Sequence, residues 1–134
     1  MTPFGKSIVS ILAAGAWITL SEFVRNELLL KSKWIEHYQA LGMTFPSEPV
    51  NGIVWMVWSF LFAGAVYAIS RKYSLLRTFL LSWFMGFVLM WLVIGNMNVL
   101  PLGILPFAIP LSLLEAFVAA YLIEKIAPAG SRPV

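Results

Sequence analysis

Cysteine and aspartate are absent from this chain of 134 residues, and histidine occurs once. Without cysteine the protein forms no disulfide, no thiolate metal site and no thiol redox centre. The six glutamates are scattered along the chain, so they form no metal-ligand pattern with the one histidine. The sequence also lacks a glycine-rich phosphate loop and a nucleophile elbow. We therefore expect no metal, no cofactor and no enzymatic activity.

Charge is scarce as well, because only 11% of the residues are charged, whereas 60% are hydrophobic. Soluble domains are about 25% charged and about 45–50% apolar. A chain of this length cannot bury so much apolar side chain in a core that water surrounds. The nine lysines and arginines are dispersed, without the basic and aromatic stretches that follow a nucleic-acid backbone. The composition predicts an integral membrane protein in contact with lipid, with no nucleic-acid partner.

Four apolar segments account for most of the hydrophobic residues. Each has roughly the 20 residues that a helix needs to cross a bilayer core. The segments lack the alternation of barrel strands, and helices satisfy their own backbone groups in lipid. We predict an all-α fold, an antiparallel up-down four-helix bundle that forms a single transmembrane domain over residues 1–134. Its helices are expected at about residues 4–24, 48–70, 74–95 and 100–126, followed by a tail at 127–134.

The connection after the first helix is long and keeps a helical pattern. Glu27 and Lys31 are spaced as an i,i+4 pair. Trp34 and Tyr38 lie one helical turn apart in the same stretch. Either the first helix continues to about residue 41, or it bends into an amphipathic piece on the membrane surface.

The basic residues predict the orientation of the chain. With both termini in the cytoplasm, six basic residues lie inside and three lie outside. The inside set is Lys6, Arg71, Lys72, Arg77, Lys125 and Arg132, and the outside set is Arg25, Lys31 and Lys33. The positive-inside rule therefore favours cytoplasmic termini, in a bacterial inner membrane or an equivalent one.

Glu115 is the most informative polar residue of the fourth segment. Counted along the helix, it lies close to the bilayer midplane, where a carboxylate costs several kcal/mol unless it is paired. Two interpretations have equal support: a functional site (a proton relay, a cation site or a docking point), and a hydrogen-bonded link between helices. Ser59 lies at a similar depth on the second helix and is the expected local partner.

Pro106 and Pro110 lie in the same segment, and each removes a helix hydrogen bond. Ser112 and Glu115 have the spacing of a capping box. The fourth helix is therefore kinked, which we favour, or broken near Ile109 and restarted at Ser112.

A second group of polar and aromatic residues maps to the outer half of the protein. It comprises Glu22, Arg25, Asn26, His37, Trp55, Trp58 and Asn96. Such a group can form a pocket for a small amphipathic or cationic ligand. The favoured alternative is an ordinary belt of interfacial aromatic residues, with Glu22 and Arg25 as a neutralising pair.

Small residues at four-residue spacing mark the expected packing faces. They are Gly64 with Ala68 on the second helix and Ser82 with Gly86 on the third.

Two functions remain open from the sequence. The favoured one is an accessory or scaffold subunit of a larger membrane assembly, which fits the small size and the lack of catalytic motifs. The alternative is an oligomeric small-solute or proton-coupled transporter that uses Glu115. Both require other membrane-protein chains, identical or different, as partners.

Overall fold

The computed structural model describes residues 1–130, which form helices and turns without a strand in that range. The helices before the central turn are α1 (Pro3–Phe23), the π-helix η1 (Val24–Leu29), α2 (Lys31–Ala40) and α3 (Pro49–Ser70). Those after it are α4 (Leu75–Trp83), the π-helix η2 (Phe84–Val88), α5 (Leu89–Asn96), the 3-10 turn η3 (Leu102–Ile104) and α6 (Leu105–Ile126). Part of the predicted tail, with Arg132, lies outside the described residues.

Four helical spans within the described residues are long and apolar enough to cross a membrane. They are Pro3–Leu29, Pro49–Ser70, Leu75–Asn96 and Leu102–Ile126. The prediction of an all-α protein with four long apolar helices is therefore confirmed.

Capping side chains explain where three of these helices begin. Thr2 precedes α1, and its hydroxyl accepts a hydrogen bond from the Gly5 amide at 3.0 Å. Glu48 and Asn51 form a reciprocal capping box at the start of α3. Ser74 accepts a bond from the Arg77 amide at the start of α4. Each cap satisfies amides that the first turn of a helix leaves without partners.

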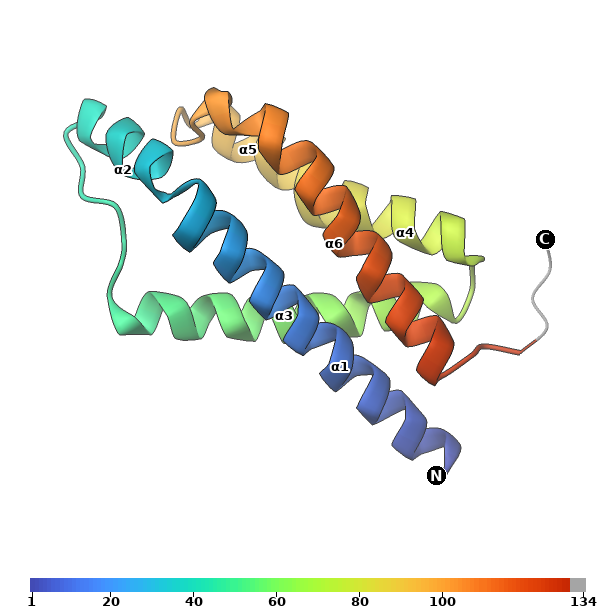
Figure 1. The fold of residues 1–134 in the computed structure, drawn as a ribbon. Coiled ribbons are helices and arrows are strands. Elements are labelled where there is room, and N and C mark those ends of the chain that lie inside the picture. The colour runs from blue at the N-terminus through green and yellow to red at the C-terminus, as the bar shows by residue number, and fades with distance from the viewer. Residues whose placement is uncertain (131–134) are drawn as a thin grey trace.

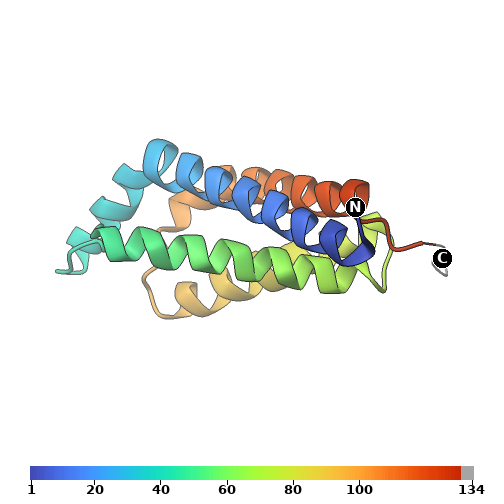
Figure 2. The ribbon, with the colours of Figure 1, turned by 90° about the horizontal axis from the view of Figure 1, so that it is seen from below.

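The four spans pack around one another as a bundle (Figure 1). Helix α1 contacts α3 and α6, and α4 also contacts both α3 and α6. The Ser7 hydroxyl lies 2.5 Å from the Tyr67 hydroxyl, so the start of α1 meets the end of α3. Figure 2 shows the N-terminus and the end of the described chain at the same end of the bundle.

Small residues form much of the contact between the helices. Ala14, Ala63 and Ala119 are fully buried in one cluster with larger side chains such as Ile18 and Phe87. Many large apolar residues face outward instead, as expected where the surrounding solvent is lipid. The buried cluster therefore contains several alanines, whereas many large apolar side chains cover the outside.

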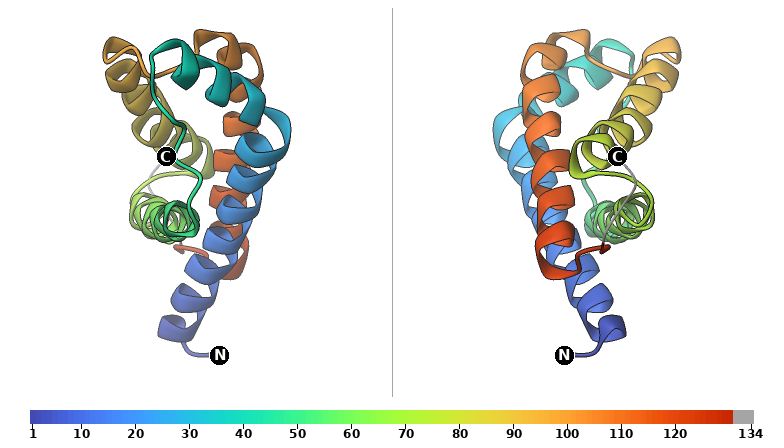
Figure 3. Two further views of the ribbon diagram at one scale, coloured as in Figure 1. Left: turned by 90° about the vertical axis from the view of Figure 1, so that its left-hand side faces the viewer. Right: turned by 90° about the vertical axis from the view of Figure 1, so that its right-hand side faces the viewer.

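The first span does not run straight into α2. Leu30 separates η1 from α2 with φ −117° and ψ 2°, which is not a helical conformation. Helix α2 therefore turns away from α1, as Figure 3 shows at the end of the bundle opposite the N-terminus. His37 on α2 lies 2.8 Å from the Asn98 carbonyl oxygen, which links α2 to the turn before η3.

Candidate functional site

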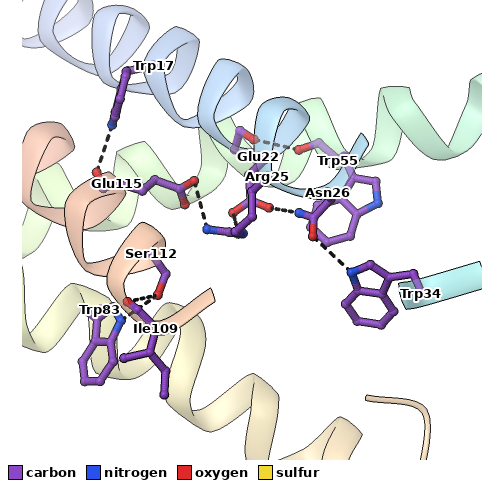
Figure 4. Close-up of polar contacts among 11 residues, drawn as sticks. Trp17, Glu22, Arg25, Asn26, Trp34, Trp55, Trp83, Ile109, Ser112 and Glu115 are labelled. Carbon is purple, nitrogen blue, oxygen red and sulfur yellow. Dashed lines mark hydrogen bonds and ion pairs between the residues drawn. The ribbon is translucent and has the colours of Figure 1, made fainter. Parts of the chain in front are cut away.

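A cluster of three ionisable residues lies buried between α1, η1 and α6. Glu115 on α6 is completely buried, Glu22 on α1 is 4% exposed and Arg25 on η1 is 5% exposed. The Arg25 Nη2 atom donates a hydrogen bond to Glu22 Oε1 at 2.5 Å. Its Nη1 atom lies 3.5 Å from Glu115 Oε1 (Figure 4). One guanidinium thus faces two carboxyl groups from two different spans.

Arg25 lies in the π-helical turn of η1, directly after the end of α1 that carries Glu22. The Leu30 amide donates to the Arg25 carbonyl oxygen at 2.9 Å, across five residues. A turn of this kind is wider than an α-helical turn and is frequent at functional sites. Glu22 and Arg25 keep the i,i+3 spacing that lets their side chains meet on one face.

A second π-helical segment supplies the aromatic side of the cluster. The Arg25 Cζ atom lies 5.2 Å from the centroid of the Phe87 ring, and Phe87 belongs to η2. This distance is within the range of a cation–π interaction. The two π-helical segments therefore meet at the buried guanidinium.

Hydrogen bonds continue from the cluster toward α2. The Asn26 amide nitrogen donates to Glu22 Oε2 at 2.9 Å, and the Trp34 indole donates to Asn26 Oδ1 at 3.3 Å. Glu22 thereby has a donor on each carboxylate oxygen. Its two oxygens are therefore both hydrogen-bonded, unlike those of Glu115.

Two tryptophans join α6 to its neighbours beside Glu115. The Trp17 indole donates to the backbone oxygen of Glu115 at 3.0 Å. On the other side, the Trp83 indole donates to the Ser112 hydroxyl at 3.0 Å. These bonds link α6 to α1 and to α4 at the depth of the buried carboxyl group.

Three atoms of the cluster lack a hydrogen bond among the described residues. They are Arg25 Nη1 and both carboxylate oxygens of Glu115. The contact between Arg25 and Glu115 is therefore an ion pair without hydrogen-bond geometry. The centre of the cluster therefore has hydrogen-bonding capacity that is not used. Each unsatisfied buried polar atom costs about 1–3 kcal/mol of the free energy of folding.

Among the described residues, Ser59, the predicted partner of Glu115, makes no hydrogen bond to it. Ser59 is buried on α3, but its hydroxyl donates to the Trp55 carbonyl oxygen at 2.9 Å. A buried serine commonly bonds to its own helix in this way, one turn back. The ion-pair partner of Glu115 is Arg25 instead.

Helix α6 is continuous through both prolines. Pro106 lies in the first turn of α6, where backbone amides have no partner within the helix, so its lack of an amide hydrogen costs no helix hydrogen bond. Pro110 lies inside the helix. The Ser112 hydroxyl donates to the Ile109 carbonyl oxygen at 3.0 Å and does not cap a new helix. The alternative of a break at Ile109 with a restart at Ser112 is therefore wrong.

The outer polar and aromatic group separates into two parts. Glu22, Arg25 and Asn26 belong to the buried cluster with Glu115. The remaining members lie outside it: His37 on α2, Trp55 and Trp58 on α3, and the exposed Asn96 at the end of α5. Trp55 and Trp58 contact each other edge to face at 6.0 Å. No group of three potential metal ligands occurs among residues 1–130.

No known protein family, curated protein or solved structure matches this chain. Likeness to other proteins therefore adds nothing to the chemistry of the buried cluster.

Proposed function

We propose that this protein is an accessory or scaffold subunit of a larger membrane assembly. The observation that supports this role is the position of Arg25 between Glu22 and Glu115. Glu22, Arg25 and Glu115 face one another, so they join α1 and η1 to α6 instead of lining an open path for a solute. Removing a partner so that a buried charge is left uncompensated destabilises a protein by about 3–5 kcal/mol, so the shared cation Arg25 fits a structural role for the cluster.

The side of the bundle has room for a helix of a partner protein. An apolar groove of about 600 Å³ runs between α3 and the α4–η2–α5 span. Its lining includes Leu61, Ala65, Met85 and Gly86. Leu61 is 70% exposed and Met85 is 60% exposed. Small residues between large apolar ones let a second transmembrane helix approach closely, and we assign this groove to such a helix of the partner protein.

The membrane orientation belongs to the same proposal. The start of α1, the turn between α3 and α4 and the end of α6 lie at one end of the bundle, and this end carries Lys6, Arg71, Lys72, Arg77 and Lys125. An excess of basic residues marks the cytoplasmic side. We place this end in the cytoplasm, with the spans in up-down order and a kink at Pro110 in α6.

Cross-linking from single cysteines tests the role, because the native chain has no cysteine. Met85→Cys lies in the groove, and Leu12→Cys is the matched control, since Leu12 is 54% exposed on α1. In native membranes Met85→Cys should give one cross-linked species of fixed mass, and Leu12→Cys should give none. The absence of a cross-linked species from both variants would contradict the proposed role.

The unsatisfied atoms of the cluster favour a second candidate, a proton-coupled transporter. Both carboxylate oxygens of Glu115 lack a hydrogen bond among the described residues, as a proton-exchanging group can. Proteoliposomes with a pH gradient separate the two functions. The scaffold role predicts equal proton leak for the native protein and for Glu115→Gln. A leak that the native protein shows and Glu115→Gln abolishes would support the transporter.

A further inference from the structure

A small groove lies at the end of the bundle that carries the N-terminus and the end of α6. It has a volume of about 280 Å³ and is lined by residues from the start of α1, the end of α3 and the segment after α6. The charged members of its lining are Lys6 and Arg71. We call it the terminal groove. It lies where three apolar spans end, which is the level of the lipid headgroups in a bilayer.

Arg71 is held in place at one side of the terminal groove. Its Cζ atom lies 4.4 Å from the centroid of the Tyr67 ring. Its Nη2 atom donates to the Ala127 carbonyl oxygen at 2.6 Å and to the Ser70 hydroxyl at 2.9 Å. No hydrogen bond within residues 1–130 uses Nη1. A guanidinium that is already ordered loses little further freedom when it binds an anion with its remaining donors.

Lys6 supplies the second positive charge. Its side chain is exposed and has no ion-pair or hydrogen-bond partner in the described part of the chain. The hydroxyl groups nearby are already engaged, because Ser7 donates to the Pro3 carbonyl oxygen and lies 2.5 Å from the Tyr67 hydroxyl. The free donors of the terminal groove are therefore the ammonium group of Lys6 and Nη1 of Arg71.

The surroundings of the terminal groove carry an excess of positive charge. Lys72, Arg77 and Lys125 lie at the same end of the bundle, and Glu124 is the acidic residue there. Lys6 also follows the first turn of α1, whose amide groups point toward the groove end of the helix and favour an anion. The positive electrostatic field of these residues, the two free donors and the position of the groove at the headgroup level all favour binding of a negatively charged group at the membrane surface.

We propose that the terminal groove binds the phosphate of an anionic phospholipid, with Lys6 and Arg71 as its ligands. A phosphate oxygen accepts bonds from both side chains, while the acyl chains continue along the apolar surface of α1 and α3. Basic pockets between spans on the cytoplasmic side suit such headgroups, and each basic residue near the surface contributes about fivefold to the affinity. The same phosphate chemistry is available from soluble phosphate, which the experiment must distinguish.

Native mass spectrometry of the full-length protein in detergent tests this site. The probes are phosphatidylglycerol, phosphatidylcholine with the same acyl chains, and inorganic phosphate. The variant is Lys6→Gln, which changes an exposed side chain and leaves the helix contacts intact. The control is Lys72→Gln, which removes the same charge from an exposed position of the same end outside the groove.

The proposal predicts tighter binding of phosphatidylglycerol than of phosphatidylcholine, and a loss of about fivefold in Lys6→Gln. Lys72→Gln should bind phosphatidylglycerol as the native protein does. Equal weakening in the two variants would show a diffuse surface charge and overturn the site. Equal binding of the two lipids would also overturn it, as would displacement of phosphatidylglycerol by millimolar inorganic phosphate.

Discussion

Arg25 Nη1 lies 3.5 Å from Glu115 Oε1, although the two residues come from the first and the last of the four long apolar spans. The same guanidinium is hydrogen-bonded to Glu22, so one buried cation serves two buried acids. A lone carboxylate at this depth would cost several kcal/mol. The ion pair explains how α6 can carry Glu115 completely buried in an apolar bundle.

Labelling of single cysteines should establish the orientation. Ser74→Cys lies in the turn between α3 and α4, and Ser47→Cys lies in the connection before α3; both serines are exposed. In intact cells a membrane-impermeant maleimide should label Ser47→Cys and leave Ser74→Cys unlabelled until the membrane is opened. The native chain has no cysteine and is the blank. The opposite labelling pattern would show that the termini lie outside.

Gly15→Ala should destabilise the contact between α1 and α3. A Cβ atom on Gly15 would lie 2.2 Å from Cδ1 of Phe60, so the ring must move. Overpacking of this kind costs about 1–3 kcal/mol of the free energy of unfolding. Gly64→Ala is the control, because no atom lies within 4 Å of the Cβ that it adds. Equal unfolding midpoints for the two variants in a denaturant titration would refute the close approach at Gly15.

Trp17→Phe should lower the free energy of unfolding by about 0.5–1.5 kcal/mol, the usual value of one hydrogen bond. The change removes the indole donor of the Glu115 carbonyl oxygen while keeping an aromatic ring. Trp55→Phe is the matched control, because Trp55 is 44% exposed on α3. Thermal unfolding in detergent compares the two variants. A larger loss in Trp55→Phe than in Trp17→Phe would speak against the link between α1 and α6.

The sequence predicted the four apolar spans, but it assigned Glu115 to one candidate site and its neighbours Glu22 and Arg25 to another. Apolar length and composition depend on single segments, so four helices could be read directly from them. The pairing of Arg25 with Glu115 depends on how distant segments pack, and the π-helical turn of η1 leaves no clear pattern in the sequence. One signal was available: a buried acid requires a cation, and Arg25 is the basic residue nearest to the outer end of the first span.

Glycine spacing shows the same limit. The expected packing pair on the second span was Gly64 with Ala68, but a Cβ on Gly64 would meet open space. Gly86 of the expected pair on the third span does make a close approach, to Phe62, and so does Gly15, which was in neither pair and faces Phe60. Small-residue spacing marks where helices can approach, whereas the partner side chain decides where they do.

The charge balance of the cluster gives the most direct test of the structural role assigned to Arg25. Glu115→Gln leaves Arg25 paired with Glu22, so its free energy of unfolding should stay within about 1 kcal/mol of the native value. Arg25→Gln leaves two buried acids without their cation and should lose about 3–5 kcal/mol. The double variant, with one buried acid fewer, should recover part of that loss.

The decisive measurement is the free energy of unfolding of the native protein, Arg25→Gln, Glu115→Gln and the double variant under one set of detergent conditions. The predicted result is a large loss in Arg25→Gln, a small one in Glu115→Gln, and a double variant more stable than Arg25→Gln alone. Losses that simply add, with Glu115→Gln as damaging as Arg25→Gln, would contradict the role of Arg25 as the shared cation of the bundle.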